Sequence, residues 1–350
     1  MTTYKKILTI IIPTYNMERY LHKCLSSLLI GEHQELLDVL VINDGSKDSS
    51  LEIALDFQVK YPDTFRVIDK ENGNYGSCIN RGLQEAKGKY IKILDADDSY
   101  DTSALATLLD RLMHIDVDLI VTDYIIVNES GEQTSRHTRK NLEKEKVISG
   151  DEIFGKCRGD LIMMHEVTYR TENLLKTDYK QTEGIAFTDQ EWILGPVATV
   201  SKAFYMDIPV YRYLVGRQGQ TVDVKRTSEL QVQGNETMFV QIDTFNKLGA
   251  VSSNVRCYLL ALILQNLRYT YRNYLIVSYD ILPISDLRVF DDRLKVANGD
   301  IYRMSGEVYV HSKYPLRFIN VWRKSRGDIP FSIKFYRSII FPILRKFHLG

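Results

Sequence analysis

Short apolar runs and longer amphipathic stretches alternate through the first 125 residues, with brief turns between them. Leu8–Pro13 is a nearly continuous apolar run, which is typical of a strand buried on both faces. Met17–Ile30 then carries apolar residues at helical spacing and stops at Gly31. Ser49 and Glu52 have the spacing of a capping box at the start of a second helix. Further strands are expected at 38–42, 65–68, 90–94 and 118–121, and further helices at 49–60, 75–86 and 103–114. This order predicts an α/β fold, with helices on both faces of an open, mostly parallel sheet.

Polar residues follow three of the expected strands at the point where each strand ends. They are Thr14-Tyr15-Asn16, Asn43-Asp44-Gly45-Ser46 and Asp95-Ala96-Asp97-Asp98. In open parallel sheets, ligands bind outside the carboxyl ends of the strands. Three carboxylates within four positions repel one another unless a cation lies among them, and Mg²⁺ or Mn²⁺ commonly joins carboxylates to substrate phosphates. The acidic cluster therefore indicates a metal-bound diphosphate, and a solvated acidic turn before the next helix is the alternative.

Composition limits the partners that the chain can bind. Its 350 residues suit one large domain, 1–222, followed by a mainly helical region, 223–350. The 45 basic and 45 acidic residues cancel, which argues against nucleic-acid binding. The four cysteines show no C-x-x-C spacing, and no run of about 18 apolar residues occurs. These features predict a cytoplasmic protein without a membrane-spanning helix.

The last segment of the chain, 313–350, is basic and aromatic. It holds nine Lys or Arg residues and one acidic residue, Asp328, among Phe, Trp, Tyr and Ile. Cationic residues beside bulky apolar ones suit an interfacial helix at the inner face of the cell membrane. The alternative is a terminal helix that packs on the preceding domain and keeps its basic face in water.

Four segments resemble the inverting family 2 glycosyltransferases that build bacterial surface polysaccharides: Thr9–Asn16, Val41–Ser46, Asn80–Gly82 and Leu94–Asp98. The resemblance is strong over about the first 115 residues and weaker to about residue 222. It implies the Rossmann-like GT-A fold and a metal-dependent, hexosyltransferase-type reaction with Mn²⁺ or Mg²⁺. It also implies a UDP-sugar donor and a saccharide acceptor, either free or lipid-linked. The donor sugar, the acceptor, the linkage and the oligomeric state do not follow from the sequence.

The resemblance assigns the first two strand ends to the nucleotide. Pro13, Thr14 and Tyr15 are expected to line its pocket, with Tyr15 near the base. Asp44 is expected to contact uracil, because a carboxylate can accept the imide N–H that cytosine lacks. An ordinary turn before a helix is the alternative for the segment around Asp44.

The resemblance assigns the acidic cluster to the diphosphate sugar. Asp95 and Ala96 are expected beside the ribose and the donor sugar, and Asp97 is the expected metal ligand. Asp98 is expected to support them or to place negative charge at the start of the next helix.

For the candidate residues outside the strand ends, the sequence leaves more than one role open. Asn80 and Arg81 are candidate donor contacts or simply polar residues at the start of a helix. In this family an acidic residue about ninety positions after the metal motif removes the acceptor proton, which points to Asp189, with Glu191 in reserve. Thr188 stands where Glu is more usual, and helix capping is the alternative role for both carboxylates.

A later segment is expected to cover the diphosphate. There Arg217 and Gln220 are candidate ligands, and Gly216 and Gly219 would let the loop move. His165 is a candidate on the acceptor side or a structural residue.

Rival functions find less support in the sequence. A nucleotidyltransferase would need a Gly-rich, Arg-containing segment after the first strand, where Pro-Thr-Tyr-Asn stands instead. A processive polysaccharide synthase would need membrane helices and a Gln-x-x-Arg-Trp segment. A catalytically inactive, nucleotide-sugar-binding scaffold protein of the same fold stays open.

Overall fold

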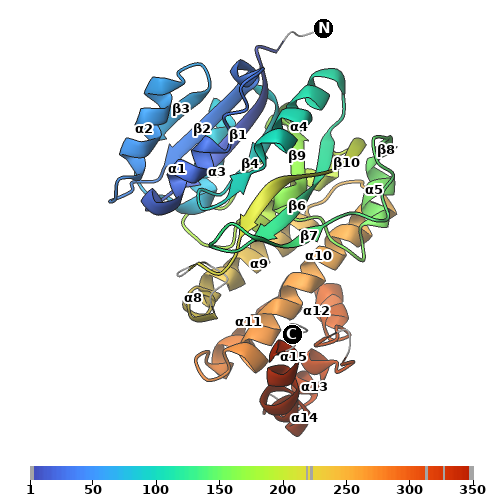
Figure 1. Cartoon of the computed structure of the whole chain (residues 1–350). Coiled ribbons are helices and arrows are strands. Elements are labelled where there is room, and N and C mark those ends of the chain that lie inside the picture. Colours follow the sequence, from blue (N-terminus) through green and yellow to red (C-terminus); the bar gives the residue numbers. More distant parts are fainter. Residues whose placement is uncertain (1–3, 218–219, 221–223, 312–313, 326–327, 347–350) are drawn as a thin grey trace. The chain divides into compact units, whose positions relative to one another are not determined.

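A mixed β-sheet forms the centre of the first of two units in the computed structural model (Figure 1). The structure describes residues 4–217, 220, 224–311, 314–325 and 328–346. The first unit comprises Met1–Arg217 with Val251–Val255, and the second comprises Gln218–Ala250 with Arg256–Gly350.

The strands follow the order β3-β2-β1-β4-β9-β6-β10-β5, with β7 paired to β6 and β8 to β10. Their bounds are β1 Lys6–Thr14, β2 Leu37–Asn43, β3 Phe65–Asp69, β4 Gly88–Ile93, β5 Ser99–Tyr100, β6 Leu119–Val127, β7 Gln133–His137, β8 Val147–Ser149, β9 Val167–Arg170 and β10 Lys202–Leu214. The first four strands pair in parallel, as the sequence predicts. β9 then runs antiparallel to both β4 and β6, and β10 returns parallel to β6. The sheet is therefore mixed beyond β4.

Helices connect these strands and cover the sheet. They are α1 Glu18–Ser26, α2 Ser50–Lys60, α3 Asn74–Glu85, α4 Thr102–His114, α5 Gly150–Lys156, α6 Thr171–Lys176 and α7 Asp189–Trp192, with short 3₁₀ helices η1 Gln34–Leu36, η2 Met164–Glu166 and η3 Pro196–Thr199. The predicted capping box is wrong, because the Ser49 side chain makes no cap hydrogen bond. Instead, Asp48 Oδ1 accepts from the Ser50 backbone N–H at 3.0 Å.

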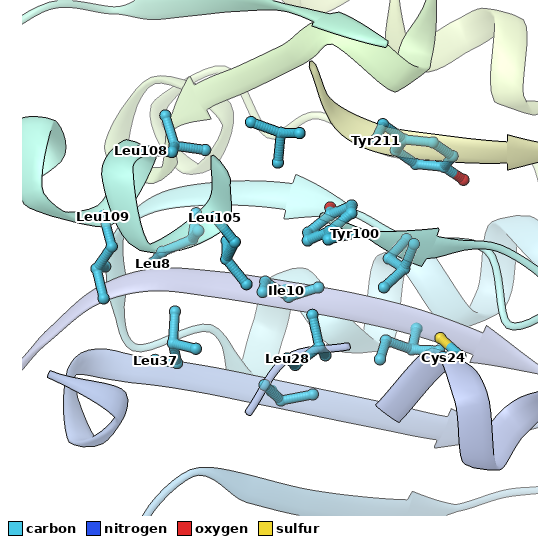
Figure 2. Packing of buried hydrophobic residues seen from close by; sticks show 14 of the residues in the cluster. Leu8, Ile10, Cys24, Leu28, Leu37, Tyr100, Leu105, Leu108, Leu109 and Tyr211 are labelled. Atoms are coloured by element: carbon cyan, nitrogen blue, oxygen red, sulfur yellow. The ribbon is translucent and has the colours of Figure 1, made fainter. Parts of the chain in front are cut away.

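The core of the first unit lies between β1, β2 and the helices α1 and α4 (Figure 2). Leu8 and Ile10 of β1 are fully buried, and Leu105 of α4 packs in the same cluster. The cluster continues beneath the acidic residues, where the rings of Tyr100 and Tyr211 meet edge to face with centroids 5.6 Å apart. Burial of this apolar surface stabilises the edge of the sheet on which the polar strand ends lie.

The second unit is helical, as the sequence pattern of the region 223–350 predicts. Its helices are α8 Val224–Glu229, α9 Gln231–Asn246, α10 Ser253–Arg272 (which begins in the first unit), α11 Ile284–Ala297, α12 Gly299–Ser305, α13 Phe318–Lys324, α14 Phe331–Phe335 and α15 Phe341–Lys346, with π-helical segments η4 Asn273–Val277 and η5 Tyr336–Ile340. Among the residues that the structure describes, no helix has the length and apolar character needed to cross a bilayer.

Candidate active site

Three polar strand ends lie along one edge of the sheet. Thr14 pairs with Asn43 at the ends of β1 and β2, and the Asp44 N–H donates to the Thr14 carbonyl at 2.8 Å. On the other side of β1, the Leu94 N–H donates to the Ile11 carbonyl at 3.0 Å, so the acidic residues start beside the same strand. The predicted convergence of these three segments is therefore observed.

The expected nucleotide residues differ in exposure. Tyr15 is 46% exposed, whereas Thr14 is buried. Asp44 is buried, and its Oδ1 accepts hydrogen bonds from Lys70 Nζ and from the Gly73 N–H, the latter at 3.0 Å. Lys70 was not foreseen, because a lysine 26 positions away gives no local signal of this pairing. An exposed aromatic ring is a suitable surface for stacking a planar base.

Asp98 anchors the site. It is buried, its Oδ2 accepts from the Tyr211 hydroxyl at 2.6 Å, and its Oδ1 accepts from the Leu214 N–H at 2.6 Å. The Tyr211 hydroxyl also accepts from the Asp95 N–H at 3.2 Å. Asp98 therefore joins the acidic segment to the end of β10. The negative charge at the start of α4 comes from Asp101, whose side chain caps that helix.

Asp95 and Asp97 are the other two carboxylates of the cluster, and Ala96 between them is buried in the apolar core. Asp95 Oδ1 accepts from the Tyr75 hydroxyl at 2.9 Å. Burial, and then the negative charge of Asp97, raise the pKa of Asp95 to about 7. Asp97 Oδ2 accepts from Arg217 Nε at 2.5 Å.

The acidic residues suit a cation that is shared with a ligand. No group of three or more His, Cys, Asp or Glu side chains within the described residues could hold a metal by itself. Mg²⁺ commonly binds through one or two carboxylates plus substrate phosphates, which matches Asp97 with Asp95 beside it. Burial is the main reason for the raised pKa of Asp95, and the charge of Asp97 is the second; a cation beside the two carboxylates would relieve the second.

The two carboxylates of α7 differ in their contacts. Asp189 is partly buried, burial raises its pKa, and its Oδ2 accepts from Gln190 Nε2 at 3.1 Å. Glu191 is buried, and its Oε2 accepts from the Thr182 N–H at 2.8 Å and from the Thr182 hydroxyl at 3.1 Å. Glu191 thus holds the loop before α7, whereas the Asp189 side chain is bonded to Gln190, its neighbour in the chain.

The Tyr75 hydroxyl donates to Asp95 and is also affected by the charge of Asp189. Its pKa lies well above the usual tyrosine value because of burial, the charge of Asp95 and then the charge of Asp189. The charge of Asp189 also raises the pKa of Asp95. The charges of Asp95 and Asp189 therefore both act at Tyr75. Tyr75 lies in the glycine-containing stretch 72–82, but no pattern there reveals that its hydroxyl meets Asp95.

Asn80 and Arg81 form hydrogen bonds within the protein. Asn80 Nδ2 donates to the Gln181 carbonyl and to Glu183 Oε1, both at 2.8 Å, and its Oδ1 accepts from the Gln181 N–H at 2.8 Å. Arg81 pairs with Glu85 on the surface of α3 at 2.9 Å. Asn80 therefore secures the same loop that Glu191 holds, and a donor contact for either residue stays a prediction.

His165 lies in a box of tyrosine rings. Its ring centroid is 5.2 Å from that of Tyr124, 4.7 Å from Tyr211 and 4.5 Å from Tyr213. Burial, and then the charge of Lys92, lower its pKa to about 3, so its imidazole is neutral at pH 7. Its buried Nδ1 has no hydrogen-bond partner within the part of the chain that the structure describes.

A buried ionic layer lies beneath His165. Lys92 Nζ, in the middle of β4, donates to the carbonyls of His165 at 2.7 Å and Val167 at 3.1 Å. Arg139 donates to both carboxylate oxygens of Glu166, at 2.7 and 2.5 Å, and both side chains are buried. The sequence predicts that 128–150 is a surface hairpin or loop with little chemistry. The β6–β7 hairpin is present. The segment does not lie wholly on the surface, however, because the Arg139 side chain is buried.

The expected diphosphate loop is described in part. Arg217 pairs with Asp97, and its guanidinium lies 5.4 Å from the ring centroid of Tyr20. Gly216 has φ +102°, a conformation that favours glycine. Gln220 is buried and belongs to the second unit, and Gly219 lies outside the described residues.

The sequence matches one protein family and several bacterial proteins. Residues 9–174 match the model of Glycosyl transferase family 2. The chain is 32% identical over 147 residues to Glycosyltransferase GlyA of Streptococcus pneumoniae. The aligned region covers 42% of this chain and 21% of GlyA. It is 27% identical over 353 residues to the minor teichoic acid biosynthesis protein GgaA of Bacillus subtilis, which covers 97% of this chain and 72% of GgaA.

Solved structures show the same fold. TarS 1–349 of S. aureus superposes with a TM-score of 0.69 at 18% identity, covering 95% of this chain and 91% of that one. The TarS complex with UDP-GlcNAc gives a TM-score of 0.66 at 17% identity, covering 95% and 92%. The predicted GT-A-like fold with a helical C-terminal region is confirmed.

Proposed function

From the match of residues 9–174 to glycosyl transferase family 2, we propose that the chain transfers a sugar from a UDP-sugar to a saccharide acceptor with inversion. One observation carries the proposal: at the carboxyl edge of the sheet the Tyr75 hydroxyl donates to Asp95 at 2.9 Å, and the negative charges of both Asp97 and Asp189 act on Asp95. This arrangement combines a diphosphate-binding pair with a separate carboxylate that can act as a base.

The uridine nucleotide is proposed to lie across the ends of β1 and β2. The exposed ring of Tyr15 would stack on the base, and Asp44 would accept the imide N–H of uracil. The TarS structure with UDP-GlcNAc supports the choice of a uridine donor, because the two chains share a fold. The long match to GgaA supports a cell-surface polymer or its precursor as the acceptor.

Asp97, with Asp95 beside it, would hold Mn²⁺ or Mg²⁺ against the diphosphate. When bound, such an ion supplies Lewis-acid neutralisation of the leaving group. Arg217 is proposed to bind diphosphate oxygens, since a guanidinium can donate two parallel hydrogen bonds to phosphate. Its position 2.5 Å from Asp97 brings it to the same site.

Asp189 is proposed to remove the proton from the acceptor hydroxyl. Its raised pKa makes it a stronger base than an ordinary aspartate, provided that the pH is high enough to ionise it. The acceptor oxygen then attacks the anomeric carbon opposite the departing diphosphate, and the configuration inverts. Glu191 is the less suitable base because its carboxylate already binds Thr182.

The test compares Asp189→Asn with Glu191→Gln. We expect Asp189→Asn to bind UDP in the presence of Mn²⁺ as the wild type does, by calorimetry, but to lose about 10²–10⁴-fold in transfer or donor hydrolysis. Glu191→Gln should lower the melting temperature more than the rate. The reverse pattern would assign the base to Glu191.

The role of Asp97 is tested separately. Asp97→Asn should lose metal-dependent turnover of UDP-sugars, and EDTA should abolish turnover in the wild type. Full wild-type activity with EDTA would disprove the metal requirement. UDP binding without turnover of any UDP-sugar would instead favour the inactive, nucleotide-binding alternative.

A further inference from the structure

The last described helical segment, 331–346, has one face packed on the second unit. It runs through α14, η5 and α15 (Figure 1). Ile333 and Tyr336 are fully buried, and the Tyr336 ring lies 5.0 Å from that of Tyr314. The Arg272 guanidinium lies 5.0 Å from the ring centroid of Phe341. The inner face of the segment therefore already has its partners.

The outer face carries a row of large apolar side chains, which we call the C-terminal stripe. It consists of Phe331, Phe335, Ile339 and Ile343, with exposed fractions of 80, 40, 48 and 51%. Their spacing of four residues places them along one side of a helix. The π-helical η5 has more residues per turn than an α-helix, so residues four apart stay closer to a single line. Contiguous exposed apolar side chains of this kind mark interaction surfaces, unlike single exposed ones.

The charged residues of the same segment are all basic. Residues 331–346 contain four Lys or Arg residues and no Asp or Glu. Lys334 is exposed beside the stripe, and the Arg337 guanidinium lies 3.8 Å from the ring centroid of Tyr279, which is itself 45% exposed. A second copy docked stripe to stripe would bring these like charges together. An anionic surface would neutralise them.

We propose that the C-terminal stripe inserts into the interface of an anionic lipid bilayer, while the neighbouring basic residues contact the lipid headgroups. An apolar row flanked by cations is the pattern of helices that lie in the plane of a membrane. This inference concerns where the chain works and is independent of the chemistry proposed above. It also chooses between the two roles left open for the basic C-terminal segment.

The test is vesicle co-sedimentation of the full chain. Vesicles contain either phosphatidylcholine alone or an equal mixture with phosphatidylglycerol. The test variant carries Phe331→Ser, Phe335→Ser and Ile339→Ser. The matched control carries Val289→Ser and Val296→Ser, which remove two exposed valines (69 and 88%) from α11 of the same unit.

We expect the wild type and the control to bind the anionic vesicles and the stripe variant to bind at least about tenfold more weakly. Binding of the wild type should fall in about 0.5 M NaCl, because salt screens the headgroup attraction. All three proteins should melt alike, since the substituted side chains are exposed.

Three results would overturn the proposal. One is unchanged binding of the stripe variant, and another is absence of wild-type binding to anionic vesicles. The third is a wild-type oligomer that the stripe substitutions convert to monomers while vesicle binding persists. That result would assign the stripe to a second copy of the chain. None of these results depends on transferase activity.

Discussion

Replacing Lys92 by methionine should change how the stability of the protein depends on pH. Lys92 is fully buried in β4, and burial lowers its pKa to about 7, although the charge of Glu166 raises it in part. In the unfolded chain a lysine titrates near 10.4. The unfolded state therefore holds one more proton than the native state between about pH 7 and pH 10.4. Stability due to this group rises with pH across that window, by about 1.4 kcal/mol per pH unit.

The net effect of Lys92→Met depends on two opposing terms. Below about pH 7 the substitution removes the cost of burying a charge, which these two pKa values put at roughly 4–5 kcal/mol. It also leaves the carbonyls of His165 and Val167 without the Lys92 donor, at about 1–3 kcal/mol each. The two terms are similar, so the variant should be about as stable as the wild type at neutral pH. At pH 9.5 the first term has fallen to about 1 kcal/mol, because that pH lies about one unit below the lysine pKa in the unfolded chain. The variant should therefore be the less stable there by about 3 kcal/mol.

Urea unfolding of both proteins between pH 7 and pH 9.5 measures this difference. Groups unrelated to Lys92 titrate equally in the two proteins and cancel in the comparison. Lys89→Met, at the edge of the same strand and beside Asp116, controls for the general loss of a lysine from β4. A constant difference between the wild type and Lys92→Met across the range would refute the assignment of Lys92 as a buried amine with a strongly lowered pKa.

Two further substitutions test contacts around the site. Tyr75→Phe removes the hydrogen bond that stabilises ionised Asp95, so the pKa of Asp95 should rise further, and the acid limb of kcat/KM should move up by about one pH unit; an unmoved limb would contradict this coupling. Gly76→Ala would place a Cβ 1.9 Å from the Thr182 carbonyl oxygen, so it should destabilise the protein by about 2 kcal/mol or more in urea. Gly159→Ala, with nothing within 4 Å, is its control, and equal losses in the two variants would show that the loop yields freely.

The first four strands could be predicted because their signals are local. An apolar run such as Leu8–Pro13 and the polar residues after it identify a buried strand and its functional end without reference to the rest of the chain. Helix ends depend on contacts that are less local. α1 ends at Ser26 and not at Ile30 as predicted. The next residue, Ser27, donates its hydroxyl to the Cys24 carbonyl at 2.6 Å and accepts from the Tyr100 N–H at 3.0 Å.

Partners separated by long stretches of sequence could not be predicted. The hydrogen bonds of Asp98 come from Tyr211 and Leu214 in β10, more than a hundred residues later. β9 pairs antiparallel with β4 and β6, and Glu166 directly precedes it. This pairing brings the Glu166 carboxylate to the buried Arg139 side chain. Neither residue type nor spacing reveals such pairs, because the fold itself brings them together.

The ion pair between Asp97 and Arg217 has a consequence for binding order. Without ligand, each charge already has a partner. If the two residues have the roles proposed above, a cation alone would compete with a guanidinium for Asp97. A nucleotide alone would draw Arg217 away and leave a carboxylate uncompensated. When both bind, the cation replaces Arg217 as the partner of Asp97, and the phosphates replace Asp97 as the partner of Arg217. The ion pair is then broken only once for two binding events. Metal and nucleotide should therefore raise each other's affinity by the same factor.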